Sequence, residues 1–168
     1  MQQELEWFLA DLDTDFKCLY LFILSDLHYG NPFCHTDLWE EQIKLIESIP
    51  NCAVILNGDL CEAAIRMSKG DIFKQVGSPQ DQRDWNIEKL KPLSKKIIGA
   101  TQGNHEYRVY NDGGMDISSD IATALGCPYD SDGIYLRIHF GDNNNRVKGK
   151  PFSYMIYCSH GYGGARTK

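Results

Sequence analysis

Two short apolar segments constrain the fold more than any other feature of this 168-residue sequence. Cys18–Leu24 is apolar throughout, and Cys52–Leu56 repeats this pattern after residues 36–49, which carry an apolar stripe at helical spacing. Strands that read as continuous apolar runs are typical of parallel sheets, in which both faces are buried. The sequence therefore predicts a strand–helix–strand unit with parallel strands, the start of an α/β fold.

The same rules place further elements in the middle of the chain. Asp37 and Glu40 are expected to cap the first helix. A strand is predicted over 96–101, a helix over 80–91 with Trp85 and Leu90 facing inward, a helix over 116–125, and a long loop or short helices over 63–79.

The last third of the chain has a different period. In Gly133–Phe140 apolar and polar residues alternate, which predicts a strand with one exposed face. Gly141–Asn145 has turn chemistry, and Pro151–Cys158 is predicted to return as the second strand of an antiparallel hairpin.

Composition excludes several classes of protein. With 42% hydrophobic and 24% charged residues, the chain is neither disordered nor of low complexity, and we expect a single domain over residues 1–168. The longest apolar run has seven residues, whereas a membrane-spanning helix needs about 20. Residues 1–16 contain no lysine or arginine, and the six cysteines form no Cys-x-x-Cys pair. We therefore expect a cytoplasmic protein with reduced thiols and no membrane partner.

Charge is unevenly distributed along the chain. Residues 1–62 carry 12 acidic and 2 basic side chains, and residues 63–168 carry 11 acidic and 15 basic ones. The basic part either is ordinary solvated surface or helps to hold a polyanionic substrate near a site.

Polar side chains with metal-ligand chemistry follow four of the predicted strands. Loops at the carboxyl ends of strands in α/β sheets converge, so four such loops together indicate a site. In chain order these residues are Asp26 and His28, Asp59, Asn104 and His105, and His160.

The types of these side chains favour a hard or borderline divalent ion over a thiolate site. Asp26 and His28 can bind the same ion only if their strand has ended by Ser25, because alternate residues of a strand point to opposite faces. Gly58 and Gly103 provide backbone that allows close approach in the next two loops.

At these positions the sequence resembles the calcineurin-like metallophosphoesterase family. The resemblance covers roughly residues 19–161 and implies the layered β-sandwich flanked by helices of that family. It rests on four motifs in family order: Asp26-Leu27-His28, Gly58-Asp59 with Glu62, Gly103-Asn104-His105-Glu106, and Ser159-His160-Gly161.

The resemblance also implies a dinuclear metal centre. Asp26, His28 and Asp59 would bind one divalent cation, and Asp59, Asn104 and His160 would bind a second one, with Asp59 bridging. Manganese is the expected ion, with iron, zinc and nickel as alternatives. A metal-bound hydroxide would then attack the phosphorus of a phosphodiester or phosphomonoester.

Two catalytic side chains are implied beside the metals. His105 would protonate the leaving oxygen or stabilise the developing charge. Glu62 would orient His105, unless it is an ordinary surface carboxylate, and Glu106 is a candidate for supporting the ligands from behind. His35 and His139 are expected to be structural or exposed to solvent.

The sequence departs from the family at its end. It has no Gly-His-x-His motif, which in the family gives one histidine to each metal. We therefore expect a metallophosphoesterase domain that lacks its C-terminal part. Truncation is favoured over a natural short form in which water or a partner chain replaces the missing ligands.

Two functions are compatible with these residues. The first is a metal-dependent phosphoesterase acting on a phosphate ester, with nucleotides and nucleic acids among the candidates. The second is a weakly active or inactive scaffold of the same fold that binds a protein partner. The protein Ser/Thr phosphatase branch is a poorer match, because Glu62 is followed by Ala63 and Ala64 rather than by Arg-Gly. The sequence leaves the oligomeric state open.

Overall fold

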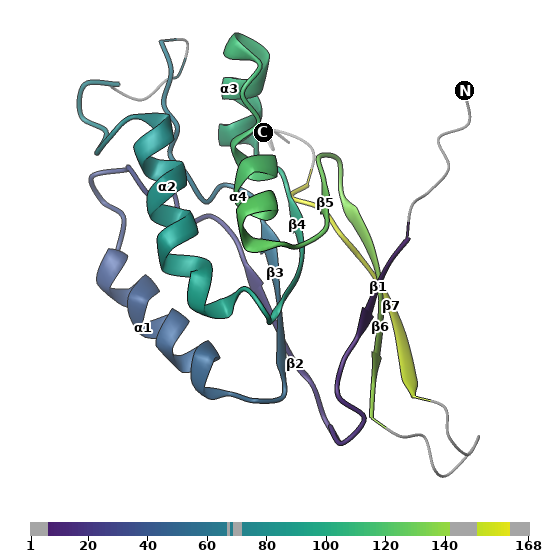
Figure 1. Cartoon of the computed structure of the whole chain (residues 1–168). Coiled ribbons are helices and arrows are strands. Elements are labelled where there is room, and N and C mark those ends of the chain that lie inside the picture. The colour runs from purple at the N-terminus through teal and green to yellow at the C-terminus, as the bar shows by residue number, and fades with distance from the viewer. Residues whose placement is uncertain (1–6, 67, 69–71, 142–150, 162–168) are drawn as a thin grey trace, which may run out of the picture.

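The computed structural model describes residues 7–66, 68, 72–141 and 151–161, which form two β-sheets and four α-helices (Figure 1). The predicted mixed α/β class is confirmed. The elements are β1 (Trp7–Asp11), β2 (Tyr20–Leu24), α1 (Thr36–Ser48), β3 (Cys52–Asn57), α2 (Pro79–Leu90), the 3-10 helix η1 (Lys91–Leu93), β4 (Ile97–Thr101), α3 (Asn104–Gly113), α4 (Ile117–Leu125), β5 (Tyr129–Asp130), β6 (Ile134–Phe140) and β7 (Phe152–Cys158).

The first sheet is parallel, with the strand order β2-β3-β4-β5. Alternate residues of β3 point to opposite faces and fill two different cores. Val54 and Leu56 pack with the helices, and Ala53 and Ile55 pack against the second sheet. The helices therefore cover one face of this sheet, and the second sheet covers the other (Figure 1).

The second sheet has the order β1-β6-β7 and is mixed. β6 and β7 form the predicted antiparallel hairpin, and Ile134, Leu136, Ile138 and Phe140 are buried as their alternation predicts. β1 was not expected from the sequence, and it pairs in parallel with β6. Of the turn predicted over Gly141–Asn145, residues 142–145 lie outside the described residues.

Three local predictions need correction. The strand over residues 18–24 begins only at Tyr20 and is not buried on both faces, because β2 is the edge strand and Tyr20 and Ile23 are exposed. The expected cap of α1 does not form, since its N-cap residue is His35 and no side chain accepts a hydrogen bond there. The segment that begins at Asn104 is the helix α3, which was not predicted.

The other helix predictions agree with the structure within a residue or two. α2 begins with a capping box between Ser78 and Asp81, and α4 begins with Asp116 as its N-cap. Among the described residues, no helix combines the length and apolarity that crossing a membrane requires.

Candidate metal centre

Four strand ends meet at one edge of the molecule. β2, β3, β4 and β7 end at Leu24, Asn57, Thr101 and Cys158, and each is followed by candidate ligands. His160 reaches the end of β3 directly, because its ring nitrogen Nδ1 lies 2.7 Å from the carbonyl oxygen of Asn57. The hairpin that carries His160 is thereby joined to the carboxyl edge of the parallel sheet.

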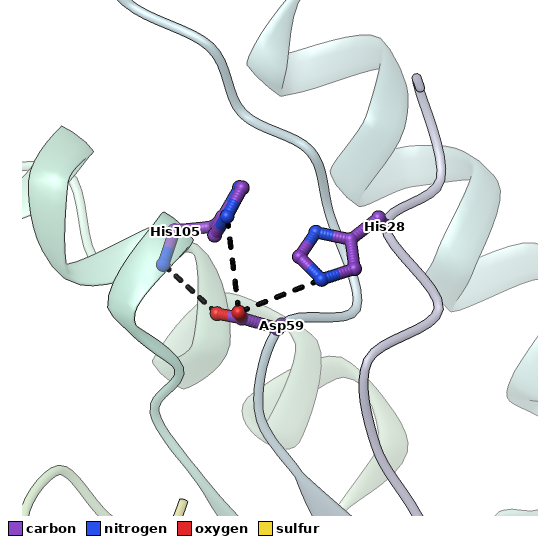
Figure 2. Close-up of side chains that lie close together, drawn as sticks. All are labelled: His28, Asp59 and His105. Atoms are coloured by element: carbon purple, nitrogen blue, oxygen red, sulfur yellow. Dashed lines mark hydrogen bonds and ion pairs between the residues drawn. The ribbon is translucent and has the colours of Figure 1, made fainter. Parts of the chain in front are cut away.

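Asp59 lies at the centre of this arrangement. It is only 3% exposed, and its Oδ2 atom faces three imidazole nitrogens. The Nε2 atoms of His160, His28 and His105 lie 3.3, 3.7 and 3.9 Å from Oδ2. Figure 2 shows His28 and His105 on either side of the Asp59 carboxylate. Two ligands held about 2.1 Å from one ion lie about 3 to 4.2 Å apart, so these spacings suit a shared cation.

Two groups of potential ligands share Asp59. The first contains Asp26 and His160, the second contains His28 and His105, and within each group the ligand atoms lie within 4.8 Å of one another. This grouping differs from the one that the resemblance implies, in which His28 accompanies Asp26. The two arrangements are close in space, because Nε2 of His28 is also 3.8 Å from Oδ1 of Asp26.

Asn104, the remaining candidate ligand, is the first residue of α3 and is exposed. The residue after it ties the helix to the centre, since the backbone N–H of His105 donates to Oδ1 of Asp59 at 2.8 Å. The first turn of a helix carries a partial positive charge, which favours a carboxylate at this place.

The loops that carry the ligands have unusual backbone conformations. Asp26, His28 and Asp59 have φ angles of 57°, 51° and 52°, in the left-handed region that non-glycine residues rarely adopt. The condition stated for Asp26 and His28 is therefore met, because the chain has left the strand before Asp26. Each such residue costs about 1–2 kcal/mol relative to ordinary backbone. Such conformations persist only where surrounding contacts hold them.

Close contact between two loops provides part of this support. A Cβ atom on Gly103 would lie 2.0 Å from the backbone nitrogen of Asp59, and one on Gly58 would lie 2.5 Å from the backbone nitrogen of Gly103. Only glycine at both positions lets the loops approach this closely.

Glu106, which lies behind the centre, provides the rest of the support for these loops. Its fully buried carboxylate accepts the backbone N–H of Asp59 on Oε2 at 3.0 Å and that of Cys61 on Oε1 at 2.9 Å. Burial and the charge of Asp59 raise the pKa of Glu106, and the two backbone donors lower it. Burial is the largest of these effects, and the resulting pKa is about 7. Glu106 thus fixes the loop between β3 and the α2 region, as the expectation of a supporting role requires.

His105 is oriented by Glu62, but through a different atom from the one expected. Its Nδ1 atom lies 2.7 Å from the Glu62 carbonyl oxygen, whereas the Glu62 carboxylate is 3.9 Å away. That carboxylate instead accepts a hydrogen bond from Asn31 and lies 3.5 Å from Nδ1 of His28. Burial lowers the pKa of His105, and its neutral ring must carry the proton on Nδ1, because a carbonyl oxygen can only accept.

Asn57 is a residue that the sequence analysis missed. Its carbonyl oxygen accepts from Ser25 and contacts His160, and its Oδ1 atom accepts from Thr101 and from the thiol of Cys158. One residue therefore links the ends of β2, β3, β4 and β7. The only sequence signal for it is a polar side chain at the end of an otherwise apolar strand.

The inward face of α2 is also more polar than predicted. Gln82, Asn86 and Leu90 are buried, and Trp85 is only partly buried, stacked on Tyr29. Gln82 accepts the backbone N–H of Ala63, and Asn86 donates to the carbonyl oxygen of Leu60. These two side-chain amides hold the loop that follows Asp59. Their spacing of four residues, which places both on one face of the helix, was the signal available in the sequence.

The chemistry of the donor atoms fits a cation at this centre. In neutral His105 the Nε2 atom carries a lone pair and lies 3.9 Å from Oδ2 of Asp59, so a positive charge at this place, either a proton on Nε2 or a metal ion, is favoured. Burial lowers the pKa of His160, but its contact with Asn57 and the charges of Asp59, Asp26 and Glu106 outweigh burial and raise it. The site thus favours positive charge, and a proton and a metal ion would compete for His160.

His139 lies apart from this centre, whereas His35 is exposed and lines the same pocket as Asp26, His28 and His105. His139 is on the outer side of β6 and pairs with Asp11 at 3.0 Å, and His35 precedes α1.

Neither a scan against protein-family models nor a search of curated proteins finds a match for this chain. The functional inference therefore rests on the geometry of the centre.

Proposed function

We propose that this chain is a metal-dependent phosphoesterase of the calcineurin-like metallophosphoesterase type, with two divalent cations. One observation carries the proposal: three imidazole Nε2 atoms lie 3.3–3.9 Å from one oxygen of a buried carboxylate. The Nδ1 atom of His160 is held by a backbone carbonyl oxygen, which is how proteins usually orient metal-binding histidines, and the carbonyl of Glu62 holds Nδ1 of His105 in the same way.

Asp59 would bridge the two cations, since both groups of ligands share it. Asp26 and His160 would complete one site, and His28 would lead the other, with Asn104 as the further candidate. Oxygen and imidazole donors without cysteine suit manganese, with iron, zinc and nickel as alternatives. When bound, the cations supply positive charge for a phosphate ester and lower the pKa of water.

His105 would act on the leaving group. Its Nε2 atom is the farthest of the three from Asp59 Oδ2, at 3.9 Å, and its ring is fixed by the carbonyl of Glu62. Burial lowers the pKa of His105, so a proton held on Nε2 in the presence of an anionic phosphate is readily transferred to the departing oxygen. Glu62 contributes a backbone atom here, and its carboxylate faces His28.

Metal uptake and hydrolysis test this function together. We expect the full chain to bind manganese in equilibrium dialysis and to hydrolyse p-nitrophenyl phosphate or its bis ester with added Mn²⁺. Asp59→Asn should lower kcat/KM by at least about a hundredfold and reduce metal uptake, because it removes the shared charge. Asp112→Asn, an exposed change at the end of α3, is the matched control and should alter neither.

Two results would overturn the proposal. The first is an absence of metal uptake by a folded protein. The second is hydrolysis that Asp59→Asn leaves intact. Metal uptake without turnover on any ester, with Mn, Zn, Fe, Ni or Mg, would instead favour the scaffold function considered from the sequence.

A further inference from the structure

A groove of about 610 Å³ adjoins the candidate metal centre, and we call it the β2–α1 groove. Asp26, His28 and His105 belong to its lining, so it opens onto the centre itself. Apart from Glu62, which follows β3, the rest of the lining comes from the loop between β2 and α1 and from the first turns of α1. Phe33, Leu38 and Trp39 are the large apolar side chains of that part.

Phe33 is the most informative residue of this groove. Its side chain is 88% exposed, although apolar side chains of this size are normally buried. The loop around it is nonetheless tightly tied: the backbone N–H of Phe33 donates to Asn31 Oδ1, that of Cys34 donates to the carbonyl of Asn31, and the Cys34 thiol donates to the carbonyl of Leu27. An aromatic ring is thus held in solvent beside the centre.

The polar groups of the groove also point to a particular kind of occupant. Its lining contains no lysine or arginine, and its acidic residues, Asp26 and Glu62, belong to the candidate centre. Its basic side chains are the imidazoles of His28, His35 and His105, so a second phosphate meets no permanently charged cation there. Trp39 is buried and its indole nitrogen is closed off from solvent, so this residue contributes apolar ring surface to the groove rather than a hydrogen-bond donor.

We propose that the β2–α1 groove binds the leaving group of the substrate, and that this group is a flat, uncharged aromatic system such as a nucleoside. This inference rests on the proposed function, because the centre defines where the phosphate lies. Base stacking on an exposed aromatic ring and one or two directed hydrogen bonds are the usual means of holding such a group. The preferred substrates are then nucleoside monophosphates rather than small alkyl phosphates.

Binding without metal tests the groove independently of catalysis. Adenosine is titrated into the metal-free full chain by isothermal calorimetry. Removing a stacking ring changes affinity by about 5- to 150-fold, so Phe33→Ala should raise the Kd at least about fivefold. Phe73→Ala is the matched control, because Phe73 is 90% exposed and does not line the groove. An absence of binding, or an equal loss in both variants, would overturn the proposal.

Turnover then separates this proposal from the proposed function. Adenosine 5′-monophosphate and glycerol 3-phosphate are both primary alkyl phosphates, so their kcat/KM ratio with Mn²⁺ reports on the groove. We expect a ratio of about ten or more that falls at least about fivefold in Phe33→Ala and is kept in Phe73→Ala. Equal rates for both substrates would refute the groove proposal and leave the proposed function standing.

Two further outcomes distinguish the groove proposal from its alternatives. Adenosine binding that depends on Phe33, without hydrolysis of any ester, would refute the proposed function and support the groove as a nucleoside site. A short single-stranded oligonucleotide that binds more than about a hundredfold tighter than adenosine would identify a nucleic-acid strand as the occupant and overturn the choice of a single nucleoside.

Discussion

The carboxyl edge of the parallel sheet and the outer face of the β1-β6-β7 sheet are built in opposite ways. The edge holds Asp26, His28 and Asp59 in left-handed conformations and buries the carboxylate of Glu106. The outer face is regular, with Trp7, Tyr135 and Tyr157 in a row of ring contacts on neighbouring strands. Regular patterning therefore builds the scaffold, whereas departures from local preference gather where chemistry is proposed.

The largest effect is expected from a single methyl group added at the carboxyl edge of the parallel sheet. Gly103→Ala would place Cβ 2.0 Å from the backbone nitrogen of Asp59 and 2.6 Å from Oε2 of Glu106. We expect a loss of about 4 kcal/mol or more in the free energy of unfolding, measured by urea denaturation, together with a loss of metal uptake.

Gly113→Ala is the matched control, at the other end of α3. No described atom lies within 4 Å of its Cβ position, so the change should be neutral or stabilise by up to about 1 kcal/mol through helix propensity. Equal stability of the two variants would show that the two loops do not touch as described.

A second test compares the two faces of the β1-β6-β7 sheet. Leu136 on β6 is fully buried between the sheets, and Leu9 on β1 is exposed on the outer face. We expect Leu136→Ala to cost about 3 kcal/mol and Leu9→Ala less than about 0.5 kcal/mol in chemical denaturation. A large cost at Leu9 would mean that the outer face is covered.

A third test addresses the buried carboxylate behind the centre. Glu106→Gln replaces one acceptor oxygen by an NH₂ group, which then faces a backbone N–H of Asp59 or Cys61. We expect a loss of about 2 kcal/mol in the metal-free protein, measured by thermal denaturation. The control Glu88→Gln, exposed on α2, should change stability by less than about 0.5 kcal/mol, and a similar value for both would contradict the burial of Glu106.

The smallest expected effect is a difference in the reactivity of cysteine thiols, and it involves no change in stability. Cys18 is exposed, whereas burial raises the pKa of Cys61 well above its usual value and that of Cys127 to about 11. Since the thiolate is the reactive form, we expect a thiol reagent at pH 8 to modify Cys18 at least about tenfold faster than Cys61 or Cys127. Peptide mass mapping after timed labelling measures this, and fast labelling of Cys61 would mean that the loop after Asp59 opens readily.

Elements with strong periodicity could be predicted from the sequence. The alternation of Gly133–Phe140 fixed both the strand and its buried face, and the run Cys52–Leu56 marked a strand that is buried on both faces. The similar run Cys18–Leu24 did not, because burial depends on the position of a strand in the sheet, and β2 lies at the edge. β1 was missed because only its pairing with β6 stabilises so short a segment.

The candidate centre could be located from the sequence, but its internal contacts could not. The residues after four strand ends marked the loops that meet, since topology alone brings such ends together. The role of the Glu62 carbonyl depends on the path of the backbone, which residue types do not encode. The same holds for Asn57, whose four contacts come from strands far apart in the chain.

The hydrogen bonds that Glu106 accepts from two backbone N–H groups would affect the ion selectivity of the proposed centre. Because Asp59 and Cys61 are both held from behind, the loop between them cannot widen without breaking these bonds. Calcium needs six to eight oxygen ligands at about 2.3–2.6 Å and a yielding shell, whereas smaller transition ions accept imidazole at about 2.1 Å. At the proposed centre, a preorganised set of ligands of this kind would discriminate by ionic radius before any substrate arrives.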